Sequence, residues 1–327
     1  MKKLIIQIPC YNEEETLPTT LACLPRSLEG VDKVEWLIID DGSSDKTVEV
    51  AKAHGVDYCI SHTKNMGLAN AFMTGIEACL ERDADIIVNT DADNQYNAED
   101  IPKLIAPILT GKAEIVVGAR PIKEIEHFSF IKKWLQNLGS WAVRLASRTD
   151  IPDATSGFRA ISRRAARQLH VFNDYTYTLE TIIQAGQKQI PITWVPIRTN
   201  PFLRPSRLIR SIPSYITKSI VTILRIFVVY KPFRFFFTIG IILFLMGTIV
   251  GVRFLWYYFT GSGSGLVQSL ILASILIGIG FQTIVVAFLA DLLSVNRRLL
   301  ENMTPKDNIF PTEDASEKVS SYFQKCP

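Results

Sequence analysis

The stretch from 86 to 95 reads Ile-Ile-Val-Asn-Thr-Asp-Ala-Asp-Asn-Gln, so an apolar run leads directly into Asp91, Asp93 and Gln95. A short apolar run is typical of a strand that is buried on both faces of a parallel sheet. The polar residues that follow then lie at the carboxyl end of the strand, where open α/β sheets bind their ligands. This stretch therefore predicts both a fold class and the place where its chemistry is found.

The same unit repeats along the first 120 residues. Short apolar runs alternate with helix-length segments, which predicts an α/β fold with a mostly parallel sheet and helices on both faces. We expect strands at Leu4–Ile8, Trp36–Ile39, Val56–Ile60, Ile86–Val88 and Ile115–Val117, and helices at about 14–27, 45–54, 67–81 and 98–110.

Two more predicted strands also end in acidic loops, Pro-Cys-Tyr-Asn-Glu-Glu at 9–14 and Asp-Asp-Gly-Ser-Ser-Asp at 40–45. Taken singly, each loop has a simpler explanation, because Asp45 alone is explained as a helix cap and 40–44 as a turn. Carboxylates repel one another when they are brought together. Three acidic loops at one sheet edge therefore indicate a divalent cation or a ligand rich in hydrogen-bond donors.

Asp91, Asp93 and Gln95 offer hard oxygen ligands, which suit Mg²⁺ or Mn²⁺ and do not suit zinc or copper. Such ions usually bridge phosphates. The sequence contains neither the G-x-x-x-x-G-K-[ST] loop of nucleotidases nor the G-x-G-x-x-G motif of dinucleotide-binding domains. What remains is a nucleotide held through carboxylates and a metal ion. The five cysteines are scattered and predict neither disulfides nor a zinc site.

Charge is distributed unevenly along the chain. Residues 1–119 carry 10 basic and 20 acidic side chains, whereas residues 120–234 carry 19 basic and 6 acidic ones. A metal site beside a phosphate-attracting surface explains this split, and solvated surface charge is the simpler alternative. Nucleic acid also binds basic surfaces, but the basic stretch leads into apolar segments, so we expect anionic lipid and no nucleic acid.

Two segments without charged residues, 235–252 and 266–290, are long enough to cross a membrane, which takes roughly 20 residues of helix. A buried helical hairpin is the alternative. The connecting stretch 254–265 has no Lys or Arg, so we expect both chain ends to face the cytoplasm. Basic residues flank the spans on the other side: Lys218, Arg225, Lys231 and Arg234 before the first, and Arg297, Arg298 and Lys306 after the second.

We expect four regions, with amphipathic helices on the membrane surface at 128–148 and 211–230. Small residues on the spans are candidates for contacts between subunits, so we note a possible homo-oligomer. The regions are a cytoplasmic catalytic domain at 1–207, a juxtamembrane amphipathic helix at 208–232, two spans with a short extracytoplasmic loop at 233–291, and a polar cytoplasmic tail at 292–327, which we expect to be mobile from Glu301 onward. The small residues are Gly240, Gly247, Gly251, Gly278 and Gly280.

At these motifs the sequence resembles the family 2 glycosyltransferases of the GT-A (Rossmann-like) fold, and within them the polyprenyl-phosphate sugar transferases. The resemblance covers roughly residues 3–210. It rests on P-x-Y-N-E-E at 9–14, D-D-G-S-x-D at 40–45, Asn65-x-Gly67, D-A-D-x-Q at 91–95, Gly118-Ala119-Arg120 and Thr155-Ser-Gly-Phe-Arg159.

The resemblance implies roles for individual residues. Asp91 lies beside the donor, Asp93 with Gln95 holds Mg²⁺ or Mn²⁺ on its pyrophosphate, and Asp91 completes the expected metal site. Asp93, Arg120 and Asp153 are the expected catalytic residues. The donor nucleotide lies against Pro9, Tyr11, Glu13 and Asp41, and the acceptor phosphate against Arg120, Lys132, Arg204 and Arg207.

Some relatives carry an Asp, proposed there as a base, where this chain has Gly157. A phosphate monoester is largely dianionic at neutral pH and needs no base to attack. We keep Asp153 as a candidate for orienting that attack. The alternative is a loop carboxylate paired with Arg159 or Arg163.

The implied reaction is an inverting, metal-dependent transfer of a sugar from a nucleoside-diphosphate sugar to polyprenyl phosphate. A processive polysaccharide synthase is an alternative, but the sequence lacks the Q-x-x-R-W motif of that class. A membrane-anchored protein that only binds nucleotide sugars is a second alternative. The sequence does not determine the base or sugar of the donor.

Overall fold

The computed structural model describes residues 1–121, 130–169, 171, 177–201, 212–260, 267–303 and 323–325, with backbone alone for 130–138, 212–216, 218–219, 222–223, 297–303 and 323–325. The chain forms two compact units. One unit comprises Met1–Ser219 together with Ile309–Pro327, and the other comprises Ile220–Asn308.

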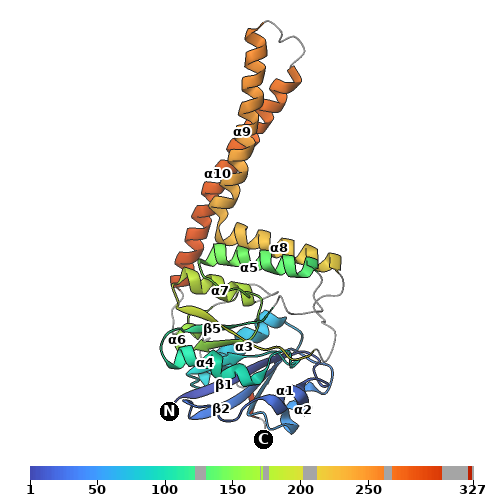
Figure 1. Cartoon of the computed structure of the whole chain (residues 1–327), viewed down its shortest axis with the longest axis vertical. Coiled ribbons are helices and arrows are strands. Elements are labelled where there is room, and N and C mark those ends of the chain that lie inside the picture. The colour runs from blue at the N-terminus through green and yellow to red at the C-terminus, as the bar shows by residue number, and fades with distance from the viewer. Residues whose placement is uncertain are drawn as a thin grey trace. The chain divides into compact units, whose positions relative to one another are not determined.

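The first unit is built on one sheet (Figure 1). Its strand order is β7-β5-β6-β4-β1-β2-β3-β8. Neighbouring strands are parallel, except that β6 runs antiparallel to β4 and β5, and β8 runs antiparallel to β3. The five predicted strands are confirmed. The strands are β1 (Lys3–Cys10), β2 (Lys33–Asp40), β3 (Tyr58–Ser61), β4 (Ile86–Asn89), β5 (Ile115–Ala119), β6 (Arg159–Ser162), β7 (Ile192–Pro196) and β8 (Phe323–Lys325).

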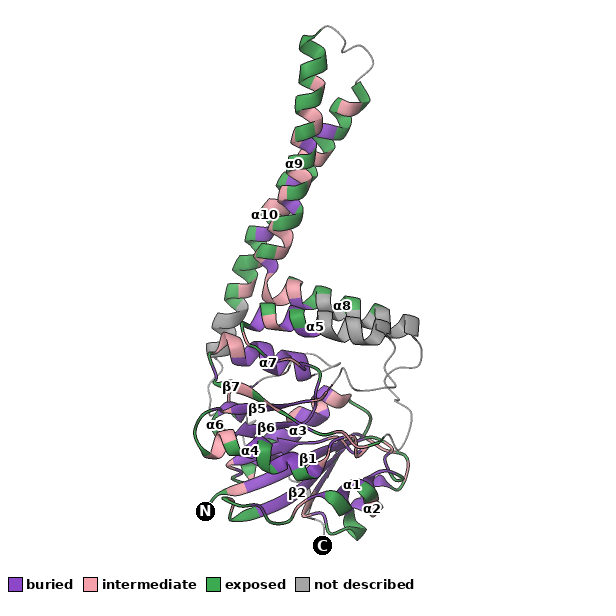
Figure 2. Ribbon diagram, in the orientation of Figure 1, coloured by how far each residue is buried: buried purple, intermediate pink, exposed green. Residues whose placement is uncertain are grey.

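Helices cover both faces of this sheet, as predicted. Because side chains alternate along a strand, Leu4, Ile6 and Ile8 of β1 pack with α1, α2 and α4, while Ile5 packs with α3, α6 and α7. Figure 2 shows the strands buried between these two layers. The helices are α1 (Leu17–Cys23), α2 (Thr47–Ala53), α3 (Leu68–Glu81), the 3₁₀ turn η1 (Ala98–Asp100), α4 (Ile101–Leu109), α5 (Phe130–Ser147), α6 (Arg163–Ala166) and α7 (Thr178–Gln187).

The second unit is a helical hairpin of α9 (Pro232–Phe259) and α10 (Val267–Met303), preceded by α8 (Ile212–Tyr230), which begins in the first unit. Pro232–Phe259 and Val267–Asn296 are long and apolar enough to cross a membrane. The hairpin helices approach closely at glycines. A Cβ on Gly240 would lie 2.8 Å from Ile284, and one on Gly247 would lie 2.8 Å from Ile277.

The glycines that were candidates for contacts between subunits can now be compared with the contacts they make within the chain. Gly280 also lies in the hairpin, where a Cβ would be 2.6 Å from the backbone nitrogen of Phe244. A Cβ on Gly251 would touch Ala273 at 3.8 Å, whereas one on Gly278 would meet nothing within 4 Å. Four of the five glycines therefore serve the contact within the chain.

The C-terminal region differs from the expected mobile polar tail. Helix α10 continues to Met303, because Leu, Arg and Glu in 292–303 are good helix formers. Beyond it, β8 pairs with β3, with Phe323 opposite Ile60. An unpaired sheet edge offers backbone donors and acceptors to any extended segment, which explains this added strand.

Replacing Gly186 with Ala is expected to destabilise the first unit. A Cβ on Gly186 of α7 would overlap the backbone carbonyl of Ser147, the last residue of α5. Overpacking of this kind costs about 1–3 kcal/mol. The control is Gly139→Ala, because a Cβ on Gly139 of α5 meets nothing within 4 Å and alanine favours a helix by about 1 kcal/mol. Thermal unfolding in detergent measures both, and equal melting temperatures would contradict the close contact.

Candidate active site

The loops that follow β1 and β2 are joined by hydrogen bonds. The backbone N–H of Asn12 donates to Ser43 Oγ at 2.8 Å, and the N–H of Ser44 donates back to Asn12 Oδ1 at 2.8 Å. Asn12 has a φ of 55°, which an asparagine tolerates better than most residues. The N–H of Glu13 donates to Thr47 Oγ1 at 2.8 Å. The first two acidic segments therefore form one surface at the carboxyl edge of the sheet.

Asp41 connects this surface to the Asn65-x-Gly67 segment. Its buried carboxylate accepts hydrogen bonds from the backbone N–H groups of Met66 and Gly67, each at 2.8 Å. His62 Nδ1 lies 2.8 Å from Asp41 Oδ1, and His62 Nε2 lies 3.1 Å from Thr74 Oγ1. A carboxylate accepts about four hydrogen bonds, so these three leave Asp41 capacity for one more.

The loop with Asp91, Asp93 and Gln95 follows β4 and is held from two sides. On one side, the Thr20 hydroxyl donates to the carbonyl of Ala92 at 2.8 Å. On the other, Asn200 Nδ2 donates to the carbonyl of Asn94 at 3.0 Å, and the backbone N–H of Asn200 donates to the carbonyl of Gln95 at 2.9 Å. Within the loop, the N–H of Gln95 donates to Asp93 Oδ1 at 3.1 Å.

The carboxylates of this loop repel one another. Burial, together with the neighbouring charge of Asp93, raises the pKa of Asp91 to about 7, although Arg120 and the Tyr96 hydroxyl act in the opposite direction. A nearby cation would stabilise the charged form of a carboxyl group whose pKa is raised in this way. In the described part of the chain, no three His, Cys, Asp or Glu side chains group to hold an ion.

Two carboxylates and an amide nevertheless fit Mg²⁺ or Mn²⁺. Mg²⁺ is usually bound by one or two carboxylates, and phosphates and water complete its octahedron. Asp91, Asp93 and Gln95 offer a donor set of this kind, with oxygen ligands only.

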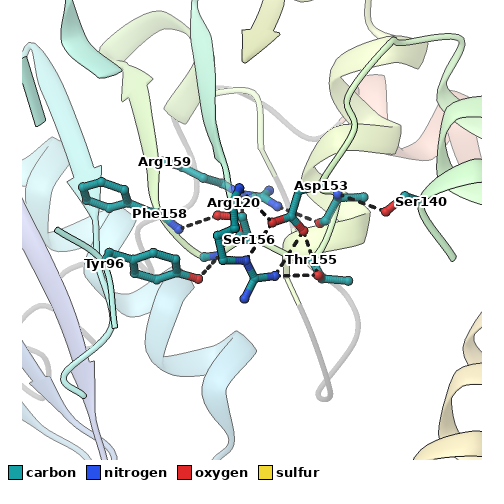
Figure 3. A network of polar contacts seen from close by, with 10 residues as sticks. Tyr96, Arg120, Ser140, Asp153, Thr155, Ser156, Phe158 and Arg159 are labelled. Atoms are coloured by element: carbon teal, nitrogen blue, oxygen red, sulfur yellow. Dashed lines mark hydrogen bonds and ion pairs between the residues drawn. The ribbon is translucent and has the colours of Figure 1, made fainter. Parts of the chain in front are cut away.

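The loop before β6 places Asp153 against Arg120 (Figure 3). Arg120 Nε donates to Asp153 Oδ2 at 2.7 Å, and Arg120 Nη2 donates to Oδ1 at 3.1 Å. Burial disfavours the charged form of Asp153, but the adjacent guanidinium outweighs it and holds the pKa of this carboxyl below its usual range. The expected alternative partners were wrong: Arg163 pairs with Asp83, and Arg159 donates to backbone carbonyls and Thr181.

Below Asp91 lies a buried polar network that the sequence analysis did not identify. The N–H of Gly157 donates to the Tyr96 hydroxyl at 2.9 Å, and Asn89 Nδ2 donates to the Gly157 carbonyl at 2.8 Å. Gln7 Nε2 donates to Asn89 Oδ1 at 2.9 Å, directly across β1 and β4. The available signal in the sequence was an amide inside one apolar run, Gln7, and an amide directly after another, Asn89.

Gly157 itself allows Asp91 its position. A Cβ on Gly157 would lie 3.0 Å from Asp91 Oδ1 and 2.8 Å from the Tyr177 hydroxyl. A side chain at this position would therefore compete with the Asp91 carboxylate for space.

The remaining predicted site residues are placed as follows. Pro9 is buried in β1, Tyr11 is exposed in the loop after it, and Glu13 is buried, where it accepts a hydrogen bond from the Thr16 hydroxyl at 2.6 Å. Lys132 lies in the part of α5, residues 130–138, where the structure describes only the backbone, and Arg204 and Arg207 lie outside the described residues. The structure thus brings the donor and metal candidates to one edge with Arg120.

The fold and the site together define a class of protein: an α/β domain that carries carboxylates at the carboxyl edge of its sheet. The profile of glycosyl transferase family 2 matches residues 5–169. The chain belongs to this family and is a glycosyltransferase.

Similar proteins include two polyprenyl-phosphate sugar transferases. A UDP-N-acetylglucosamine–dolichyl-phosphate N-acetylglucosaminyltransferase of Methanococcus voltae is 31% identical over 220 residues, which cover 61% of this chain and 86% of that protein. An undecaprenyl-phosphate mannosyltransferase of Micrococcus luteus is 30% identical over 208 residues, which cover 59% of this chain and 84% of that protein.

A solved structure supports the fold. The glucosyl-3-phosphoglycerate synthase of Mycobacterium tuberculosis, in complex with Mn²⁺, UDP and glucosyl-3-phosphoglycerate, has a TM-score of 0.55 and 21% sequence identity. The match covers 69% of this chain and 80% of that one. Likeness at this identity shows the shared fold.

Replacing Gly42 with Ala is expected to disturb the donor side of the site. Gly42 has a φ of +73°, and a Cβ there would lie 2.6 Å from the backbone of Lys64. Positive φ costs alanine roughly 1 kcal/mol, and the clash adds about 1–3 kcal/mol and displaces the 64–67 segment. We expect a lower melting temperature and a higher KM for the nucleotide sugar.

Gly111→Ala is the matched control. Gly111 has a φ of +70°, but a Cβ there meets nothing within 4 Å. It should therefore lose only the roughly 1 kcal/mol of backbone strain and keep the donor KM. If the two variants behaved alike, the packing of Gly42 against Lys64 would not matter for the site.

Proposed function

We propose that this glycosyltransferase moves a sugar, with inversion, from a UDP-hexose or GDP-mannose to a polyprenyl phosphate such as undecaprenyl or dolichyl phosphate. The observation that carries the proposal is the pair of crowded carboxylates, Asp91 and Asp93, beside Arg120 at one sheet edge. The named activities of the related proteins from Methanococcus voltae and Micrococcus luteus support the acceptor class.

On the donor side, Pro9, Tyr11, Glu13 and Asp41 line the pocket of the nucleotide. The remaining acceptor capacity of Asp41, after its bonds to Met66, Gly67 and His62, is available to one donor on the base. Because backbone N–H groups fix the carboxylate, its direction is set before the nucleotide binds. Such preorganisation lowers the entropic cost of binding.

On the leaving-group side, Asp91, Asp93 and Gln95 are the residues that would hold Mg²⁺ or Mn²⁺. Bound there, the ion supplies positive charge to the diphosphate of the departing nucleotide. Burial and the neighbouring charge of Asp93 together raise the pKa of Asp91, which supports this assignment, because a buried carboxylate beside another is costly without a cation.

On the acceptor side, the phosphate dianion needs no general base. One of its oxygens forms a bond to the anomeric carbon while the bond from that carbon to the diphosphate breaks, and the nucleoside diphosphate leaves with the electron pair. Arg120, Lys132, Arg204 and Arg207 are the proposed phosphate-binding residues. Their task is to position the attacking oxygen, since alignment of the reacting atoms supplies much of the rate enhancement.

We also propose that the chain is an integral membrane protein, with both ends on the cytoplasmic side. The two long apolar helices and the basic residues that flank them support this topology. The pairing of β8 with β3 supports it independently. A strand that follows both spans can join the sheet that precedes them only if the chain crosses the membrane an even number of times.

The two alternatives have less support. A processive synthase needs a channel of several helices for its polymer, whereas two candidate spans are found in the described residues. A protein that only binds nucleotide sugars has little need for a metal on the leaving group.

Transfer assays test the proposed reaction. The purified protein is incubated with radiolabelled UDP-glucose, UDP-galactose, UDP-N-acetylglucosamine or GDP-mannose, with undecaprenyl or dolichyl phosphate, and with Mg²⁺, Mn²⁺ or EDTA. We expect a lipid-linked product that EDTA abolishes, and a loss of roughly a hundredfold or more in Asp93→Ala. Glu29→Ala, which removes an exposed carboxylate far from the carboxyl edge, serves as the control. Nucleotide binding without any lipid product would contradict the proposal.

Labelling with a membrane-impermeant maleimide tests the topology. Cys23 is exposed, whereas Cys10, Cys59 and Cys79 are buried. We expect Cys23, retained in Cys326→Ser, and Cys326, retained in Cys23→Ser, to react from the same face of sealed vesicles. A Ser264→Cys substitution between α9 and α10, made without Cys23 and Cys326, should react only from the opposite face. Reaction of all three from one face would exclude two membrane spans.

A further inference from the structure

The guanidinium of Arg120 is held along one edge. Its Nε and Nη2 donate to the two oxygens of Asp153, and Nη2 also donates to Thr155 Oγ1 at 2.9 Å. In the described part of the chain, Nη1 has no hydrogen bond. Figure 3 shows this nitrogen pointing away from Asp153. Since 9% of the Arg120 side chain is exposed, its orientation is set by these contacts and not by solvent.

The carboxylate of Asp153 is fully occupied. Its Oδ2 accepts from Arg120 Nε and from the backbone N–H of Arg120 at 3.3 Å, and its Oδ1 accepts from Arg120 Nη2 and from the Thr155 hydroxyl at 2.9 Å. Four donors use the four acceptor positions of a carboxylate. With 1% of its side chain exposed, Asp153 has neither the space nor the acceptor capacity to take a proton from a substrate.

The turn that carries Asp153 is itself clamped. Arg159 is fully buried, and it donates through Nε to the carbonyl of Ser156 at 2.9 Å and through Nη2 to the carbonyl of Ala154 at 3.0 Å. From α5, Ser140 Oγ accepts from the N–H of Ala154 at 3.4 Å. The Asp153–Arg120 contact therefore rests on a rigid support.

We propose that Asp153 is a positioning residue that acts through Arg120: it fixes the guanidinium so that Nη1 alone is directed at the reacting phosphate. This inference rests on the proposed function. Because Asp153 offsets the charge of Arg120, the arginine contributes directed N–H groups and little net charge. The positive charge that attracts the phosphate then comes from other basic residues. Without the Asp153 carboxylate to orient it, Arg120 contributes much less to kcat/KM.

A double-mutant cycle separates positioning from independent catalysis. The variants are Arg120→Gln, Asp153→Asn and the double variant, each assayed for kcat and for the KM of the acceptor. We expect Asp153→Asn alone to lower kcat/KM by about 10- to 100-fold, mainly through the acceptor KM, because misplacement of a positioning group costs about this much. In the Arg120→Gln background the same change should alter kcat/KM by less than about threefold, since contacting residues are not additive.

A base role predicts a different result. Removal of a general base costs about 10²–10⁴-fold in rate whether or not Arg120 is present, and it abolishes the acidic limb of the pH profile of kcat. Additive losses in the cycle, or loss of that limb in Asp153→Asn, would overturn the inference.

Two further variants test whether the effect comes from the orientation of Arg120 or from a general loss of stability. Thr155→Val removes a hydrogen bond to Arg120 without changing charge, and it should raise the acceptor KM severalfold only when Arg120 is present. Glu35→Gln removes another buried carboxylate, which lies 2.6 Å from Lys3 Nζ at the amino end of β2. It controls for lost stability, and it should lower the melting temperature and leave both kinetic constants unchanged.

The double-mutant cycle still tests the positioning role of Asp153 if the proposed acceptor is wrong. It compares kcat/KM for whichever acceptor the wild-type enzyme uses, so transfer to an acceptor other than polyprenyl phosphate would sink the proposed function alone. Additivity with polyprenyl phosphate as the acceptor would sink the positioning role alone.

Discussion

Carboxylates gathered at the edge where the parallel strands of one mixed sheet end are the constraint around which this site is built. Three of them are stabilised by backbone N–H groups: Asp40 accepts from Ser43, Asp41 from Met66 and Gly67, and Asp45 from Glu14 and Thr47. A fourth, Asp153, is stabilised by Arg120. At Asp91, by contrast, burial and the neighbouring charge of Asp93 together raise the pKa to about 7, although Arg120 acts in the opposite direction. The site thus contains two kinds of carboxylate: those whose hydrogen bonds and ion pairs hold the loops in place, and those that a cation would stabilise.

The antiparallel strand β6 brings the second half of the site to this edge. Because β6 lies between β4 and β5 in the opposite direction, it begins where those strands end, with Arg159 opposite Asn89 and Val117. The turn that precedes β6 therefore meets the loops that follow β4 and β5. This geometry places Gly157 beside Asp91 and Asp153 beside Arg120. A wholly parallel sheet would carry the turn to the far edge.

The buried network beneath the site shows how the core serves the chemistry. Gln7 and Asn89 pair across β1 and β4, and Asn89 reaches both the Gly157 carbonyl and the Tyr177 hydroxyl at 2.8 Å. Tyr177 stacks on Phe72 of α3 with ring centroids 3.9 Å apart. A buried polar network is costly unless its members are satisfied, and a satisfied one specifies a single arrangement. Here it fixes the backbone at Gly157, on which the position of Asp91 depends.

Local patterns in the sequence were enough to predict the strands and helices and to predict that the functional residues follow the strand ends. Periodicity and length predicted the first five strands and the helices between them, and uncharged length predicted the two candidate spans. Three acidic strand ends predicted a common site, because parallel strands end at the same edge.

Tertiary structure alone decided the partners: Arg120 for Asp153, the 64–67 segment for Asp41, and β3 for the C-terminal strand β8. From the sequence, Arg159 and Arg163 were the expected partners of Asp153. Arg120 has the same chemistry as both. Which of these arginines Asp153 meets depends on the order and direction of strands, and that order arises from packing between residues far apart in the chain, which no local pattern records.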